Sequence, residues 1–196
     1  MSEPRVYVAC LACYNEGHLP GRWMDKDDLE TWWDNMDEPF LKEDETALKP
    51  LCVRHLEEFD REEIGVDDNL QMEYAITYTW NSEWAIHDSE HIPTKGEHPD
   101  IPILVEVMGD IEEHGAPYIA YVNLKGGLEE ASVDDFYDRY NGEWRSPREL
   151  AYEYVEDTGM LRDVDETVCQ YFDYDLFGTH MLQEMTEVDG YLFRNY

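Results

Sequence analysis

Acidic side chains recur in this chain at the spacing of one helical turn. Their carboxylates are therefore the first candidates for functional groups. Residues three, four or seven apart share one face of a helix, where neighbours stand about 5–6 Å apart. Three segments carry such a row. The rows comprise Asp27, Glu30 and Asp34; Glu106, Asp110 and Glu113; and Glu149, Glu153 and Glu156, with Asp157 beside the last. Rows of this kind place negative charges at regular intervals, as the phosphates of a nucleic acid backbone do.

A second set of residues has the ligand types of a zinc site. Cys10 and Cys13 form a C-x-x-C pair, and Cys52 with His55 forms a C-x-x-H pair, which together resemble a four-ligand pattern. The first pair lies in a continuous strand pattern, in which side chains three apart point to opposite faces. Buried, reduced thiols are therefore favoured over a zinc site, and we expect no metal and no other cofactor.

The stretch AIHDSEH offers His87, Asp88 and His91 as metal ligands or as an acid–base pair. If this stretch is a strand, His87 and Asp88 face opposite ways, so a structural histidine with its hydrogen bonds satisfied is favoured. The sequence contains no Gly-rich phosphate loop, no G-x-S-x-G elbow and no H-E-x-x-H motif. These observations do not indicate an enzyme, and we expect no catalytic residues.

Each acidic row lies opposite an apolar stripe, which predicts an amphipathic helix for each of the three segments. The first covers about 25–36, and the second ends at Gly115. The third begins after Ser146, which forms a capping box with Glu149, and it ends at Gly159. The rows should therefore lie on rigid, solvent-facing helix surfaces.

The remaining segments predict small antiparallel sheets and further helices. Asp189-Gly190 between two apolar runs predicts a β-hairpin, and Ser132 precedes a helix with Asp135 at its third position. Further predictions are a strand over 5–15 that turns at 15–17 and returns through 18–25, strands at 72–80 and 83–88, and helices within 50–65 and at 174–182. The fold class is thus α+β, with an N-terminal α+β domain at 1–96, a mostly helical middle domain at 97–136 and a C-terminal α+β domain at 137–196.

Charge excludes several classes of partner. The chain has 196 residues, with 47 acidic against 14 basic side chains and a net charge of −33. Its 42% hydrophobic and 13% aromatic content predicts a folded protein rather than a disordered acidic tail. Neither nucleic acid nor an anionic membrane surface is an expected partner, because binding either needs clustered Lys and Arg. The start of the sequence lacks the pattern of a signal peptide, so we expect a cytoplasmic protein.

The net negative charge of the chain is comparable with that of a short DNA duplex. At about 1.7 Å of duplex per charge, 33 negative charges correspond to roughly 56 Å of DNA. One interpretation is that the protein occupies the DNA-binding groove of another protein, where positive charges relieve its self-repulsion. The alternative is a general adaptation to solubility or high salt. Mimicry should gather the acids into tracks, whereas salt adaptation should spread them all around.

Several stretches resemble the ArdA-type antirestriction proteins. They are YVACLACYNEGHLPGRWMD, EWAIHD, ELAYEYVEDTG, YFDYDLFG and GYLFRNY, in the family's order and spread over almost the whole chain. The resemblance implies an elongated, curved, three-domain α+β DNA mimic that occupies the DNA-binding groove of type I restriction-modification enzymes. It also implies a homodimer formed through the third domain, 137–196. Residues 38–78 look like material added to the first domain.

The sequence therefore predicts a non-enzymatic inhibitor of type I restriction-modification enzymes, carried in bacteria by a mobile genetic element. The rows of carboxylates would take the places of phosphates. Two alternatives stay open. One is an acidic interaction module directed at another DNA-binding protein, and the other is a metal-dependent enzyme that uses the Cys/His set.

Overall fold

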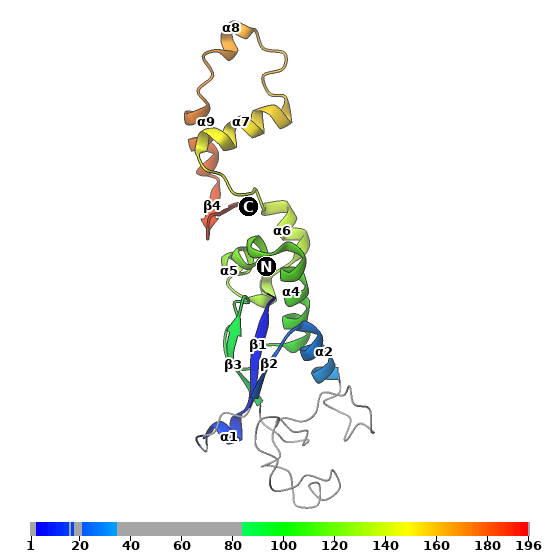
Figure 1. The fold of residues 1–196 in the computed structure, drawn as a ribbon. Coiled ribbons are helices and arrows are strands. Elements are labelled where there is room, and N and C mark those ends of the chain that lie inside the picture. Colours follow the sequence, from blue (N-terminus) through cyan, green and yellow to red (C-terminus); the bar gives the residue numbers. More distant parts are fainter. Residues whose placement is uncertain (1–2, 16, 18–20, 35–83, 196) are drawn as a thin grey trace, which may run out of the picture. The chain divides into compact units, whose positions relative to one another are not determined.

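The computed structural model describes residues 3–15, 17, 21–34 and 84–195, and these form two compact units. Unit 1 is Met1–Gly115 with Gly127–Glu129, and unit 2 is Ala116–Gly126 with Glu130–Tyr196. Each unit combines helices with a small antiparallel sheet (Figure 1). The predicted α+β class is confirmed, while the division into three domains with joins near 96 and 136 stays a prediction.

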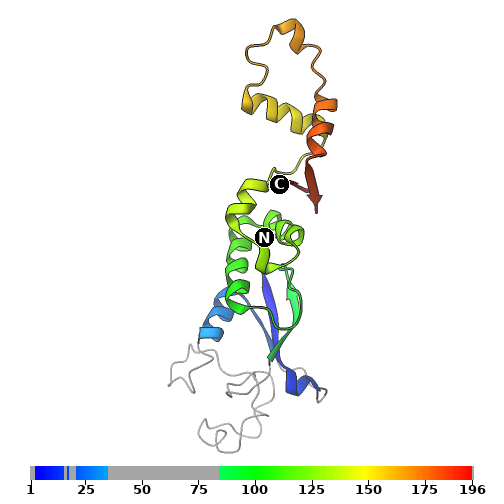
Figure 2. The same cartoon turned by 180° about the vertical axis from the view of Figure 1, so that it is seen from behind.

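The sheet of unit 1 has three strands in the order β2-β1-β3. The strands are β1 (Arg5–Cys10), β2 (Gly21–Met24) and β3 (Trp84–Glu90). Both pairings are antiparallel, with Val6 opposite Met24 on one side and Ser89 on the other. Seen from behind, β1 lies between its two neighbours (Figure 2). The strand predicted at 83–88 is therefore confirmed.

The first strand is shorter than predicted. β1 ends at Cys10, and residues Leu11–Asn15 form the helix α1, so the strand prediction for 11–15 is wrong. Leu and Ala favour helices, whereas Val and Tyr, which fill β1, favour strands. The antiparallel pairing of β1 with β2 is confirmed. Because Cys10 and Cys13 do not share a strand, the argument that their side chains face apart no longer applies.

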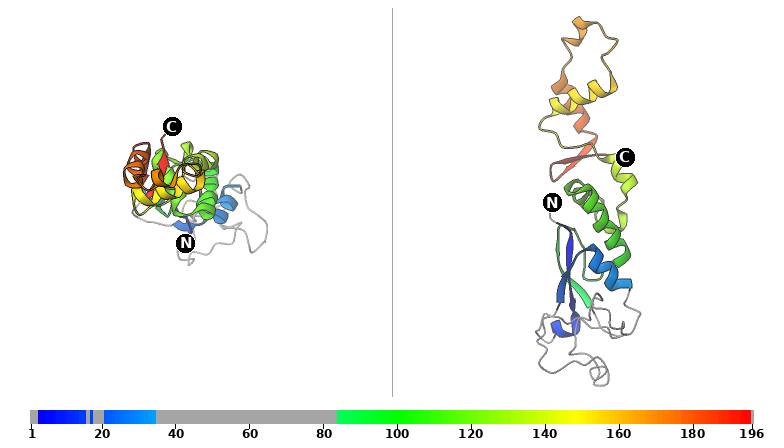
Figure 3. Two further views of the ribbon diagram at one scale, coloured as in Figure 1. Left: turned by 90° about the horizontal axis from the view of Figure 1, so that it is seen from above. Right: turned by 45° about the vertical axis from the view of Figure 1, so that its right-hand side comes forward.

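Two helices accompany this sheet, α2 (Lys26–Asp34) and α4 (Ile101–His114). They pack against each other, and Figure 3 shows them side by side next to the strands. Each buries its apolar stripe, Leu29 and Trp32 on α2 and five residues on α4. The buried residues of α4 are Ile101, Leu104, Val107, Met108 and Ile111. The amphipathic helices predicted for these two acidic segments are confirmed.

Unit 2 contains five helices and a hairpin among its described residues. They are α5 (Ala116–Lys125), α6 (Val133–Arg139), α7 (Pro147–Thr158), α8 (Glu166–Cys169), α9 (Tyr174–Leu182), β4 (Met185–Val188) and β5 (Tyr191–Arg194). A short 3-10 helix, η3 (Leu128–Glu130), precedes α6, and its first two residues belong to unit 1. The hairpin turns at Asp189 and Gly190, which have φ angles of 52° and 89°, as a two-residue turn of type I′ requires. The predicted hairpin and the helix at 174–182 are confirmed.

Two groups of buried residues hold unit 2 together. Around α5 and α6, aromatic rings pack with centroids 5.1 Å apart for Tyr118 and Phe136 and 6.1 Å apart for Tyr121 and Phe193. The second group lies between α7 and α9, where Leu150, Ala151 and Val155 are buried. Gly178 of α9 is also buried.

Three predictions lie outside the described residues. They are the helix within 50–65, the strand at 72–80 and the added material at 38–78.

Candidate functional site

The row on α2 faces solvent. Asp27, Glu30 and Asp34 are all exposed, while Leu29 and Trp32 on the opposite side are buried. The helix begins after Asp25, whose Oδ1 accepts a hydrogen bond of 2.9 Å from the backbone N–H of Asp28. Acidic residues in the first turn also interact favourably with the helix dipole. Local capping and side-chain burial together turn the carboxylates outward.

One lysine partly neutralises this row. The Nζ atom of Lys26 lies 3.0 Å from Asp27 Oδ1 and 3.6 Å from Glu30 Oε2. The hydrogen bond to Asp27 raises the pKa of Lys26, and the charges of Asp27, Glu30 and Glu112 raise it further. The side chain also reaches α4, since a Cβ built at Gly109 would lie 3.4 Å from Lys26 Cδ. Lys26 therefore joins the acidic surfaces of α2 and α4.

The row on α4 is largely exposed. Glu106 and Glu113 are exposed and Asp110 is half-buried. Asp100 caps the helix by accepting a 3.2 Å hydrogen bond from the N–H of Ile103. At the other end, the N–H of Gly115 donates to Ile111 O at 2.8 Å, and Gly115 has a φ of 71°. These caps give α4 defined ends, so the carboxylates project from a helix of fixed length.

The row on α7 is the most open of the three. Glu149, Glu153, Glu156 and Asp157 are all exposed, and within the described residues none of the four forms an ion pair with a lysine or arginine. Arginines are nevertheless available in unit 2, where Nη1 of Arg148 lies 2.9 Å from Asp175 Oδ2. The carboxylates of this row therefore face solvent without a paired cation among the described residues.

The ends of α7 follow the prediction with one difference. The Ser146 hydroxyl accepts a 3.2 Å hydrogen bond from the N–H of Glu149, and Gly159 adopts the left-handed conformation at φ 64°. The Glu149 carboxylate, however, accepts its 2.8 Å hydrogen bond from the N–H of Arg145 instead of Ser146. The capping box therefore reaches one residue further back than predicted.

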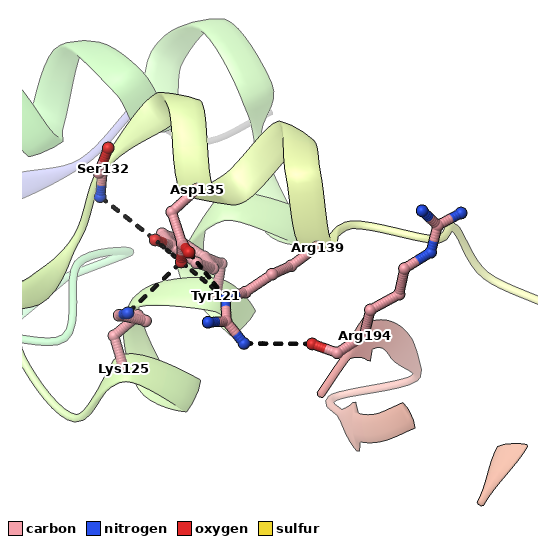
Figure 4. Close-up of polar contacts among 6 residues, drawn as sticks. All are labelled: Tyr121, Lys125, Ser132, Asp135, Arg139 and Arg194. Carbon is pink, nitrogen blue, oxygen red and sulfur yellow. Dashed lines mark hydrogen bonds and ion pairs between the residues drawn. The ribbon is translucent and has the colours of Figure 1, made fainter. Parts of the chain in front are cut away.

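Asp135 has a role that sequence reasoning missed. The sequence predicts it only as the residue at the third position of the helix that follows Ser132. In the structure its Oδ2 accepts a 2.7 Å hydrogen bond from the Tyr121 hydroxyl and lies 3.4 Å from Lys125 Nζ (Figure 4). Arg139 Nε donates to both carboxylate oxygens, Oδ1 and Oδ2, at 2.8 Å each. Arg139 Nη1 also donates to the carbonyl of Arg194 at 3.2 Å. We call these four side chains, Tyr121, Lys125, Asp135 and Arg139, the Asp135 cluster.

The Asp135 cluster shifts the titration of its members. Burial raises the pKa of Asp135, but hydrogen bonds from Tyr121, Arg139 and Lys125 outweigh burial, so the pKa of this carboxyl is lowered overall. Burial, followed by the hydrogen bond to Asp135, raises the pKa of the Tyr121 hydroxyl. Asp135 is thus a partly buried charged group whose hydrogen bonds tie α5 to α6, and its charge is already paired within unit 2.

The candidate chemical sites do not come together in the described residues. His87 and Asp88 lie on β3 as predicted, and Asp88 is exposed with its Oδ1 accepting a 2.8 Å hydrogen bond from Ser89 N–H. The Nε2 atom of His87 is buried without a hydrogen-bond partner in the described structure, so the prediction of a satisfied histidine is wrong. Its ring instead lies 4.6 Å from that of Tyr14.

Metal ligation and membrane crossing have no candidate among the described residues. No group of three or more His, Cys, Asp or Glu side chains there is placed to hold a metal ion. The side chains of Cys10 and Cys13, and the residues Cys52 and His55, lie outside the description. No helix in the described ranges has the length and apolar character needed to cross a membrane.

A comparison with protein families gives one match. The family model described as antirestriction protein (ArdA) matches residues 6–192, which covers both units and all three acidic rows. No curated protein matches the chain. Four of the five stretches that carry the resemblance lie within the matched range, and the last, GYLFRNY, begins there and runs past residue 192.

Proposed function

This chain belongs to the antirestriction protein (ArdA) family, and from that premise we infer that it is a DNA mimic directed at type I restriction-modification enzymes. Membership implies a non-enzymatic antirestriction function, with a restriction-modification enzyme as the partner. In the proposed mechanism the protein occupies the DNA-binding groove of that enzyme, and its carboxylates take the places of DNA phosphates. Inhibition is then a competition between the protein and DNA for one positively charged surface.

The observation that carries this proposal is the row on α7. Glu149, Glu153 and Glu156 are exposed one turn apart on a capped helix, and within the described residues no lysine or arginine pairs with them. The spacing of about 5–6 Å is comparable with the separation of successive phosphates along a DNA strand. A groove evolved to neutralise phosphates would meet the same sign of charge at a similar interval.

The mechanism implies many weak contacts and a strong dependence on salt. An exposed ion pair contributes about 0.2–1 kcal/mol, so no single carboxylate dominates. The net charge of −33 would steer the protein towards a basic groove, and added salt would screen that attraction. A protein of this kind inhibits by the sum of its charges.

Removing the α7 row should weaken inhibition by about tenfold, since three exposed charge contacts are lost together. The test variant is E149Q/E153Q/E156Q. DNA cleavage and DNA methylation by a type I enzyme are measured against inhibitor concentration, at low salt and at rising salt. This variant and the wild type should both inhibit less as salt rises.

The matched control is E143Q/E166Q/E187Q, which removes the same charge from exposed positions in unit 2 that do not form a row. This control should retain most of the inhibition. Equal loss in the two triple variants would count against the row and in favour of net charge alone. If Glu153→Gln by itself abolished inhibition, a catalytic or metal role would replace mimicry. If the type I enzyme were unaffected by wild-type protein, the target would be another DNA-binding protein.

We further propose a homodimer formed through 137–196. In support, the segment from the end of α7 into the first turn of α9 carries five exposed apolar side chains, and α8 within it has no buried residue. They are Met160, Val164, Val168, Tyr171 and Leu176. Exposed apolar surface of this kind commonly marks a protein interface.

Sedimentation velocity should therefore show a species of twice the 23.2 kDa chain mass. Val168→Arg, at a side chain that is 59% exposed, should shift the equilibrium to monomer by placing a charge in an apolar contact. Tyr14→Arg in unit 1, at 49% exposure, should leave the dimer intact. A wild-type monomer at micromolar concentration would disprove the proposal.

A further inference from the structure

We propose that the solvent-facing side of α7 binds arginine side chains of a basic partner, with Tyr152 between Glu149 and Glu156 providing an aromatic face for the guanidinium group. This inference rests on the proposed function, because it specifies the chemistry of the groove that the acidic row enters. A plain row of charges would attract lysine and arginine alike. An aromatic ring set within the row selects arginine.

Tyr152 is placed for this role by its position on the helix. It lies three residues after Glu149 and four before Glu156, so both carboxylates are its neighbours one turn away. The side chain is 54% exposed, and its ring centroid lies 5.7 Å from that of Tyr174 on α9. The ring thus packs against Tyr174, while about half of the side chain remains exposed to solvent.

The chain itself already uses this combination twice to hold an arginine. The guanidinium carbon of Arg148 lies 5.8 Å from the centroid of Tyr174, while Nη1 lies 2.9 Å from Asp175 Oδ2. In unit 1, the guanidinium carbon of Arg5 lies 4.9 Å from the Trp23 ring, and its Nη2 lies 2.7 Å from a carboxylate oxygen of Glu90. In both places one arginine contacts an aromatic ring and a carboxylate at once.

Tyr152 with its two glutamates offers the same pair of groups, but the arginine is missing from the described residues. No cation–π contact there involves Tyr152, and no ion pair there involves Glu149 or Glu156. The first example, Arg148 with Tyr174, adjoins Tyr152, because the rings of Tyr174 and Tyr152 pack against each other. A guanidinium from outside would extend this arrangement along α7.

Arginine is favoured over lysine for a physical reason. Its guanidinium group is planar, stacks on aromatic rings, and donates in a fork to a carboxylate, whereas an ammonium is a compact and more strongly hydrated charge. Lys26 and Lys125 are consistent with this distinction, because the ion pairs described for them are with carboxylates. The α7 surface should therefore discriminate between two cations that carry the same charge.

The experiment compares two capped tripeptides, one with arginine at both ends around a central glycine and the other with lysine in the same places. Backbone amide shifts of α7 in the isotopically labelled full chain report binding at matched ionic strength. We expect the arginine peptide to bind α7 roughly two- to fivefold more tightly than the lysine peptide, as an exposed cation–π contact allows. E149Q/E153Q/E156Q should weaken both peptides.

The tyrosine variants separate the ring from its packing. Tyr152→Leu should bring the ratio of the two affinities close to one, while Tyr152→Phe, which keeps the ring against Tyr174, should preserve it. Tyr14→Leu removes a tyrosine of similar exposure, 49%, from α1, a helix without acidic residues, and should leave the ratio unchanged.

Equal affinities of wild type for the two peptides, or an unchanged ratio in Tyr152→Leu, would overturn the inference. Loss of the arginine preference in Tyr152→Phe would overturn it as well. These results are independent of the inhibition assay. Inhibition of the type I enzyme without arginine preference would remove only this inference, and arginine preference without inhibition would remove only the proposed target.

Discussion

Gly178→Ala should destabilise unit 2 by about 3 kcal/mol or more, at the upper end of the range for overpacked sites. A Cβ built at this position would overlap the carbonyl oxygen and carbonyl carbon of Pro147 and lie 3.0 Å from its Cα. Because the obstacle is backbone, no rotation of a side chain can relieve the clash. The first turn of α7 must move away from α9, and the packing of Leu150, Ala151 and Val155 moves with it.

The matched control is Gly109→Ala, the same substitution inside another helix. A Cβ there would meet only the flexible end of Lys26, at 3.4 and 3.9 Å. Alanine is favoured over glycine in a helix by about 0.5–1 kcal/mol, so this variant should be slightly more stable than wild type. Urea unfolding followed by circular dichroism measures both. Similar changes in the two variants would show that α7 and α9 do not approach as described.

Asp135→Asn should destabilise unit 2 by about 1–3 kcal/mol at neutral pH, the range for a hydrogen-bonded group left without its partner. The substitution removes the negative charge that lies 2.8 Å from Arg139 Nε and 3.4 Å from Lys125 Nζ. The expected loss of stability is smaller than that for breaking a fully buried ion pair, because the Asp135 side chain is 31% exposed. Asp134→Asn, the same change at an exposed neighbour, should cost only a few tenths of a kcal/mol.

The effect of Asp135 should depend on pH in a defined direction. Its pKa is lowered in the folded protein relative to about 3.9 in an unfolded chain. The stabilisation is therefore fully present above the unfolded pKa and is lost as pH falls through the lower folded pKa. The difference in unfolding free energy between wild type and Asp135→Asn should be constant near neutrality and shrink below about pH 4. A difference that stayed constant down to pH 2 would contradict the role of the charge.

Local rules were sufficient for the elements that carry the acidic rows. The ends of α7 follow from Ser146 and Gly159, and the hairpin of β4 and β5 follows from Asp189 and Gly190. The apolar stripes of α2 and α4 predicted which face of each helix is buried, and therefore which face carries the exposed acids. In each case the decisive residues lie within one or two turns of each other, so their preferences act before any distant contact forms.

Other elements could not be predicted in this way. Residues 116–122 of α5 form a nearly continuous apolar run, which does not distinguish a helix from a buried strand, and α8 is a single turn without a buried residue. The five residues of α1 continue an apolar pattern that began as a strand. A short or uniformly apolar segment takes its conformation from what packs against it.

The sequence by itself determined that the protein carries rows of carboxylates on capped helices, because charge, periodicity and caps are properties of neighbouring residues. Only the tertiary structure decided which carboxylates face solvent without a paired cation and which form hydrogen bonds and ion pairs within the fold. The structural role of Asp135 became visible only in the fold, where the hydroxyl of Tyr121, 14 residues away, donates a hydrogen bond to it. The closeness of Gly178 to Pro147, and of Tyr152 to Tyr174, likewise depends on how α7 and α9 pack. Contacts between distant residues form only when the chain has folded, so no local pattern records them.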